Sequence, residues 1–148
     1  MATNKQITET LKRVLGNTYA LYLKTHGYHW NVEGPSFKSL HELFEEQYTQ
    51  MWQSIDEIAE RIRMLGTFAP MGGEILAGAT IDTADNSVPS ANGMVQNLVA
   101  GHEAWLEDTA AALNEAEEAG DTATETLLGD LITGHEKMAW MLRASLER

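Results

Sequence analysis

The sequence predicts an all-α protein, a four-helix bundle with one long crossover, and two observations lead to this fold class. Four stretches carry apolar residues at the three- and four-residue spacing of an amphipathic helix. The connections between these stretches run short, long, short, which is the order found in a bundle with one crossover. The chain has 148 residues, 43% of them apolar, and is large enough for one domain over residues 1–148.

The first two expected helices are bounded by residues that favour helix ends. The first begins near residue 4 and stops before Gly34-Pro35, a pair that terminates helices. A serine, Ser36 or Ser39, restarts the chain, and the second helix ends before Gly66.

The crossover follows and is expected to contain a short helix over residues 74–79. Ser90 precedes the third helix, Gly120 closes it, and Asp121 or Thr122 opens the fourth. The four helices are therefore expected over about residues 4–32, 37–65, 91–119 and 122–146.

The length of the crossover predicts the direction of the helices. About 23 extended residues can span roughly 75 Å, whereas a helix of 28 residues is only about 42 Å long. The crossover can therefore return along the bundle, so we expect the second and third helices to run parallel.

Charge and composition exclude several classes of function. Lys and Arg number 10 against 22 Asp and Glu, a formal net charge of -12 that repels nucleic acid and attracts cations. The absence of cysteine excludes disulfides and thiolate metal sites. Neither a membrane-spanning run nor a secretory signal is visible, so we expect no membrane partner and a cytoplasmic location, with association with the nucleoid left open.

Two histidines lie on either side of the predicted chain reversal. His29 precedes Gly34-Pro35 and His41 follows it, with Glu45 one helical turn farther on. Imidazole and carboxylate groups without thiolate suit iron, and also zinc, cobalt or manganese. Three ligands are too few to close a site.

The missing ligands lie farther along the second helix. Asp56 and Glu60 repeat the four-residue spacing of His41 and Glu45, but about 22 Å away along the axis. In a two-fold antiparallel pair of these helices, paired residue numbers have a constant sum. That sum is 101 both for His41 with Glu60 and for Glu45 with Asp56, so a second chain can complete the site, with the axis near residues 50–51. The alternative is a face of solvated charges.

The segments HWNVEGPSFKSLHELFE (29–45) and DEIAERIRMLG (56–66) closely resemble the Dps family of mini-ferritins. The resemblance in helix layout covers nearly the whole chain. It implies a ferritin-like subunit that assembles with eleven copies of itself into a hollow dodecamer. It also implies a ferroxidase, which oxidises Fe(II), with hydrogen peroxide in preference to dioxygen, and stores ferric mineral that would otherwise promote oxidative damage.

The resemblance further implies a di-iron site at the dimer interface. One subunit would supply His29, His41 and Glu45, and its two-fold partner Asp56 and Glu60. Glu45 stands where several members have Asp, which lengthens the reach of the carboxylate by one methylene. His26 is an additional candidate ligand, and Trp30 would lie beside the metals.

Iron entry is expected through pores on three-fold axes, near the start of the last helix. The candidate pore residues are Asp121, Glu125 and Asp130. In the alternative interpretation Asp121 is a helix N-cap and the other two are solvated acids.

Two other functions compete with iron oxidation. In Dps members that bind DNA, the contact often depends on a basic terminal arm. Lys5, Lys12 and Arg13 are the only basic residues among the first 20, so direct DNA binding or compaction is disfavoured. An oxidase with its metals inside one bundle would use Glu-x-x-His motifs, which are absent. The Gly-His-Glu triplets at 101–103 and 134–136 are interpreted as a coincidence, with structural or surface histidines.

Overall fold

The computed structural model describes residues 4–83 and 85–147. These residues form helices only, so the predicted all-α class is confirmed. The elements are α1 (Asn4–Asn31), α2 (Phe37–Met64), the 3-10 helix η1 (Gly72–Gly78), α3 (Ala91–Glu118) and α4 (Thr122–Ala144). Each α-helix ends one or two residues before the position expected from the sequence. No helix within the described ranges is long and apolar enough to cross a membrane.

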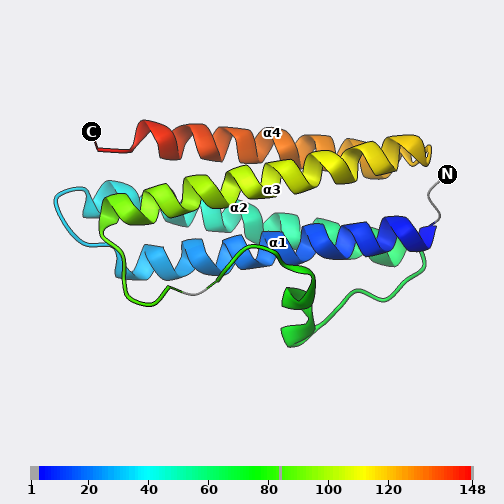
Figure 1. The fold of residues 1–148 in the computed structure, drawn as a ribbon, viewed down its shortest axis with the longest axis horizontal. Coiled ribbons are helices and arrows are strands. Elements are labelled where there is room, and N and C mark those ends of the chain that lie inside the picture. Colours follow the sequence, from blue (N-terminus) through cyan, green and yellow to red (C-terminus); the bar gives the residue numbers. More distant parts are fainter. Residues whose placement is uncertain (1–3, 84, 148) are drawn as a thin grey trace.

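The crossover determines how the two halves of the bundle are arranged (Figure 1). Helices α1 and α2 form one antiparallel pair, and α3 and α4 form the other. The crossover returns along the outside of α1, so α2 and α3 run in the same direction, as expected. The two pairs pack together mainly through α1 and α3, whereas α2 and α4 touch little.

The reversal between α1 and α2 takes place at Gly34. Its φ of 112° lies in the left-handed region, which glycine adopts without steric cost. Helix α2 then begins at Phe37, so Ser36 rather than Ser39 occupies the N-cap position, although its side chain makes no capping hydrogen bond. This short turn places the end of α1 directly beside the start of α2.

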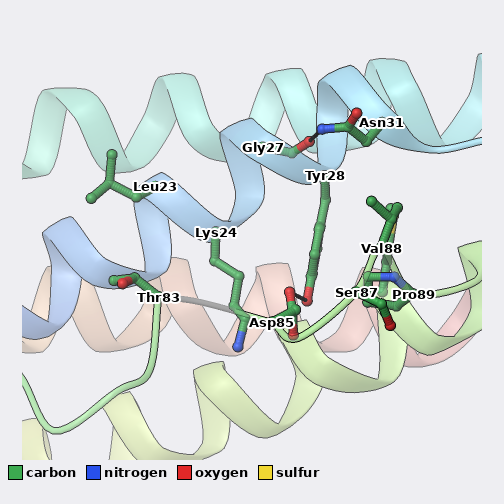
Figure 2. Close-up of a pocket in the computed structure, with 11 residues that line it drawn as sticks. Leu23, Lys24, Gly27, Tyr28, Asn31, Thr83, Asp85, Ser87, Val88 and Pro89 are labelled. Atoms are coloured by element: carbon green, nitrogen blue, oxygen red, sulfur yellow. Dashed lines mark hydrogen bonds between the residues drawn. The ribbon is translucent and has the colours of Figure 1, made fainter.

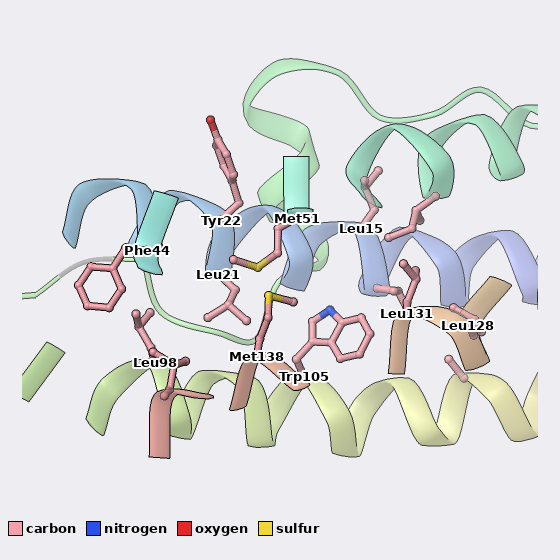
Figure 3. Close-up of a cluster of buried hydrophobic side chains, with 14 of the residues drawn as sticks. Leu15, Leu21, Tyr22, Phe44, Met51, Leu98, Trp105, Leu128, Leu131 and Met138 are labelled. Carbon is pink, nitrogen blue, oxygen red and sulfur yellow. The ribbon is translucent and has the colours of Figure 1, made fainter. Parts of the chain in front are cut away.

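The core is apolar with a few paired polar groups (Figure 3). Leucine, methionine and phenylalanine side chains from the four helices form this core, and Trp105 within it is fully buried. The Trp105 indole donates a hydrogen bond of 2.9 Å to the hydroxyl of Thr18. A buried indole N–H needs such a partner, so this bond fixes the register of α3 against α1.

The crossover is anchored to the bundle by the buried side chain of Asn17. Its carbonyl oxygen accepts a hydrogen bond of 2.7 Å from the backbone N–H of Thr80, and its amide donates one of 2.9 Å to Asp108. Glycines allow the close approach that this requires. A Cβ atom at Gly16 would lie 2.8 Å from the backbone nitrogen of Ala79, and one at Gly78 would lie 2.8 Å from a backbone oxygen of α1.

The start of α4 is held to α2 by Asp121, which occupies the N-cap. Its carboxylate accepts hydrogen bonds from the Thr124 backbone N–H at 3.1 Å and from the Arg61 guanidinium at 2.8 Å. Burial alone would raise the pKa of Asp121, but the bonds from Thr124 and the charge of Arg61 outweigh it and lower that pKa. Because α2 and α4 touch little elsewhere, this bond is a main tie between them.

We expect Gly16→Ala to destabilise the fold by about 1–3 kcal/mol, because the new methyl group would overlap backbone atoms that cannot move independently. Thermal unfolding followed by circular dichroism measures the loss. Gly129→Ala is the matched helical control, since its Cβ would meet only a leucine methyl at 3.8 Å. Equal melting temperatures for the two variants would contradict the close packing of the crossover.

We expect Asp121→Asn to lower the free energy of unfolding at pH 7 by about 1–2 kcal/mol. Asparagine can still cap the helix, but the charged hydrogen bond with Arg61 is lost. A carboxyl group whose pKa is lowered by folding stabilises the fold above its unfolded pKa, about 3.9, and loses that contribution as pH falls through the folded pKa. Urea unfolding should therefore give a lower free energy of unfolding for the variant than for the wild type at pH 7, and a smaller difference below about pH 4. Asp130→Asn, an exposed acid on the same helix, is the control.

Candidate metal centre

His29 and His41 exchange hydrogen bonds across the turn at Gly34. The Nδ1 atom of His29 donates to the backbone carbonyl of His41, and the Nδ1 of His41 donates to the carbonyl of His29, each at 2.7 Å. The rings stack with their centroids 3.9 Å apart and their planes 11° from parallel. The end of α1 and the start of α2 are therefore joined by a reciprocal bond between the two histidines.

This exchange determines which nitrogen of each ring can bind a metal. A carbonyl accepts only, so the proton must be on Nδ1, and the lone pair of each neutral imidazole is then on Nε2. Metal-binding histidines usually donate their second nitrogen in this way, which fixes the tautomer and raises the basicity of the ligand. Both Nε2 atoms of the pair are thus prepared for metal binding before any metal is present.

Aromatic rings hold the two imidazoles in place. Phe37 stacks on His41 at 4.9 Å, and Tyr48 meets His29 edge-on at 5.2 Å. His29 itself is only 7% exposed. Sequence reasoning missed the role of Phe37, although its position four residues before His41 places both on one helix face.

The Glu45 carboxylate is placed to share a metal with His29. Its Oε1 lies 3.9 Å from the Nε2 of His29, and its side chain is 59% exposed. Two atoms bound to one metal at about 2.1 Å are at most about 4.2 Å apart. The separation therefore fits a common metal ion, and the exposure leaves room for further ligands. Of the five predicted ligands, the structure thus places His29 beside both His41 and Glu45.

Asp56 and Glu60 do not join them within one chain. Both are exposed on α2, and the unbroken helix separates Asp56 from His41 by about 22 Å. Among the described residues of a single chain, no three His, Asp or Glu side chains gather closely enough to hold a metal ion. In the half-site of His29, His41 and Glu45, the carboxylate is exposed, His41 is half-buried and His29 is buried.

His26 lies near the half-site but is engaged by other aromatic groups. Its ring stacks between Tyr48 at 4.1 Å and Trp30 at 4.2 Å, and its Nδ1 lies 3.1 Å from the Tyr22 hydroxyl. Burial, and secondarily the neighbouring His29, lower the pKa of His26, so the ring remains neutral at pH 7. Its role as a ligand stays a prediction.

The three pore candidates differ in their surroundings. Asp121 is the N-cap of α4 and pairs with Arg61, as the alternative interpretation anticipated. Glu125 is half-buried in the first turn, and Asp130 is exposed. A pore would require three chains, so the role of these acids in iron entry stays a prediction.

A hollow lies between α1 and the crossover, away from the half-site (Figure 2). Tyr28 crosses it, donating a hydrogen bond of 2.7 Å to Asp85 and accepting one of 3.1 Å from Asn97. Burial, together with the Asp85 carboxylate, raises the pKa of Tyr28, so the phenol remains a donor. None of the predicted metal ligands lines this hollow. The hydrogen bonds of Tyr28 in this hollow hold the crossover against α1 and α3.

The interior of the bundle does not carry the ligands of a single-bundle di-iron site. Its buried polar side chains, within the part of the chain that the structure describes, are Thr, Asn, Gln, Ser and His, with no carboxylate among them. This agrees with the absence of Glu-x-x-His motifs.

Comparison with known proteins places this geometry in a family. The ferritin-like domain family matches residues 8–148. The DNA protection during starvation protein 2 of Bacillus anthracis is 40% identical over 147 residues, which cover 98% of this chain and 99% of that protein. The solved structure of a Dps protein from Bacillus brevis superposes with a TM-score of 0.93 at 37% identity, covering 99% of this chain and 100% of the other.

A Dps protein from Vibrio cholerae O1 gives a TM-score of 0.90 at 36% identity, covering 97% of this chain and 91% of that one. It is described as a member of a broad superfamily of ferritin-like diiron-carboxylate proteins. Sequence, fold and the carboxylate-histidine chemistry of the half-site agree, and the chain belongs to the Dps family of ferritin-like proteins.

Proposed function

We propose that this protein is a ferroxidase and iron-storing mini-ferritin whose metal site forms only between two chains. The observation that carries the proposal is the half-site itself. The hydrogen bonds of His29 and His41 leave both Nε2 lone pairs available for a metal. The Nε2 of His29 lies 3.9 Å from the Glu45 carboxylate, a spacing that fits one metal ion. Asp56 and Glu60 of a two-fold partner would complete the site, because antiparallel α2 helices would place His41 opposite Glu60 and Glu45 opposite Asp56.

The exposed face of α1 and α2 supports this dimer. Trp52 is 59% exposed and lies within two residues of the expected two-fold axis, and Trp30 is 64% exposed beside the half-site. Large exposed aromatic side chains next to a polar site are typical of surfaces that become buried on association. Antiparallel pairing of two α2 helices would cover Trp52 and deliver the two missing carboxylates.

Iron is the substrate in this proposal, and the electrons balance with hydrogen peroxide. Two Fe(II) ions each lose one electron, the O–O bond of one peroxide accepts both electrons and breaks, and two protons complete two water molecules. Holding two irons together allows this two-electron step and avoids release of a hydroxyl radical. The chain supplies carboxylates and imidazoles that bind Fe(II) and also accept the Fe(III) product.

The assembly and the cellular role follow from family membership. We propose a dodecamer, with a mass of about twelve times the 16.4 kDa of one chain, storing ferric mineral in its cavity. The acidic surface, at -12 per chain, would concentrate Fe(II) near the entry pores. Size-exclusion chromatography with light scattering tests the mass, and a dimer or monomer would contradict the cage.

The names of two relatives, from Bacillus anthracis and Brevibacillus brevis, refer to DNA protection. For this chain the same negative charge disfavours direct contact with phosphates. We propose that protection works by removing Fe(II) and peroxide. Retention of plasmid by the purified protein in a gel-shift assay at moderate salt would favour the alternative, a nucleoid-compacting protein with iron oxidation as a secondary activity.

Two inactive variants should complement each other if the site is shared. One variant carries His29→Ala and His41→Ala, and the other carries Asp56→Ala and Glu60→Ala. In a randomly mixed assembly half of the dimers are mixed and one of their two sites is intact, so about one quarter of the wild-type ferroxidase rate should return. Glu57→Ala, an exposed acid beside Asp56, is the control and should remain fully active. No recovery after co-refolding, with assembly confirmed, would contradict the shared site.

The stoichiometry of oxidation should be two irons per peroxide. Fe(II) is loaded anaerobically at two ions per site, peroxide is added stepwise, and ferric absorbance is followed. We expect the absorbance to saturate at one peroxide per two irons, with little hydroxyl radical detected by a spin trap. A ratio of one iron per peroxide with strong radical signal would indicate uncoupled one-electron chemistry and contradict the proposed reaction.

A further inference from the structure

The histidines of the two Gly-His-Glu triplets meet inside the bundle, so of the two predicted alternatives, structural or surface, they are structural. His102 of α3 and His135 of α4 are 0% and 1% exposed, and their Nδ1 atoms lie 3.0 Å apart. The glycine before each histidine lets α1 and α2 pack closely against α3 and α4 at this level. A Cβ at Gly101 would meet Leu21 of α1 at 2.7 Å, and one at Gly134 would meet the Gln50 amide of α2 at the same distance.

The contact requires two neutral rings in different tautomers. One Nδ1 must carry a proton and donate it to the lone pair of the other, so the second ring carries its proton on Nε2. Both Nε2 atoms are buried without a hydrogen-bond partner in the described structure. The plane of Trp105 covers His135 at 3.5 Å, with an angle of 6° between the rings. The pair is thus sealed on one side by an aromatic ring and has one bond in total.

We propose that the His102–His135 pair is an acid-sensitive latch between α3 and α4, closed by one hydrogen bond while neutral and opened when the chain takes up protons. This inference concerns the bundle core and does not depend on the proposed iron chemistry.

The charged groups around the pair cannot compensate a buried proton. On α3, Glu103 is exposed and pairs with Arg143 of α4 at 3.2 Å. On α4, Glu136 next to His135 is exposed.

Helices α1 and α2 contribute uncharged groups here. These are Leu21 beside Gly101 and the Gln50 amide beside Gly134. Among described residues, no Asp or Glu is buried in the bundle as a counter-ion. If the pair were protonated inside the bundle, its positive charge would have no counter-ion and the added N–H would have no acceptor, which destabilises the folded state.

The direction of the pH effect follows from this environment. Burial, and secondarily the charge of Arg143, lowers the pKa of His102 to about 3, and burial together with His102 lowers the pKa of His135 well below its usual value. In the unfolded chain both groups titrate near pH 6.5. The unfolded chain thus binds more protons below about pH 6.5, so stability is complete above that pH and falls as the solution becomes acidic. Two protons change the unfolding equilibrium about a hundredfold per pH unit.

Proton counting tests the latch directly. Potentiometric titration of the native assembly and of the same protein in urea gives the difference in bound protons per subunit. At pH 5 the double variant His102→Leu/His135→Phe should show about two fewer protons in this difference than wild type. Thr109→Val removes another buried, unpartnered polar atom of α3 without a titrating group, and should retain the wild-type value. An unchanged difference in the double variant would overturn the proposal.

A second measurement uses the unaltered protein and so does not depend on the variant folding. Hydrogen exchange at the imidazole C2 position, followed by mass spectrometry, reports the titration of each histidine in the native assembly. We expect no midpoint above pH 5 for His102 or His135. Midpoints near pH 6.5 for both would overturn the proposal.

Opening itself is measured by the loss of helical circular dichroism after a jump to acid. The double variant should keep its helices to a pH about one unit lower than wild type and the Thr109→Val control. Identical acid midpoints for all three proteins would show that proton uptake by the pair does not open the helices, and would overturn the latch.

Discussion

The reciprocal hydrogen bonds between His29 and His41 are the interaction on which the proposed chemistry depends. Each ring uses Nδ1 to hold the backbone of the other, so one contact closes the turn at Gly34 and prepares both Nε2 atoms. Removing either ring would release a backbone carbonyl as well as a ligand. The fold and the half-site are therefore stabilised by the same two bonds, and a substitution there affects both.

The rest of the bundle keeps this contact in place without taking part in the chemistry. Trp105 bonded to Thr18 sets the register of α3 against α1, Asn17 fastens the crossover, and Asp121 with Arg61 ties α4 to α2. These bonds are each worth about 1 kcal/mol, so none of them is decisive alone. Together they hold α3, the crossover and the start of α4 against α1 and α2.

Much of the fold could be predicted because its determinants are local. Helical periodicity and terminators such as Gly34 and Gly120 placed the helices within two residues, and crossover length gave their direction. His29 and His41 meet because they flank one tight turn. Three features could not be derived in the same way. They are the reciprocal hydrogen bonds of His29 and His41, the stacking of Phe37 on His41, and the contact of His102 with His135. They depend on side-chain directions and on the packing of distant segments, about which spacing along the chain carries no information. The Gly-His-Glu repeat was visible, but only the fold shows that its copies touch.

The 22 Å between the two halves of the ligand set has a consequence for biosynthesis. If Asp56 and Glu60 act only on a partner chain, a newly made subunit cannot complete a metal site by itself, however much Fe(II) surrounds it. Catalytic competence then begins with docking and not with folding. Newly made chains and chains without a partner would not oxidise iron. Because the rate at which two chains dock depends on the square of their concentration, activity would begin only after enough subunits have accumulated.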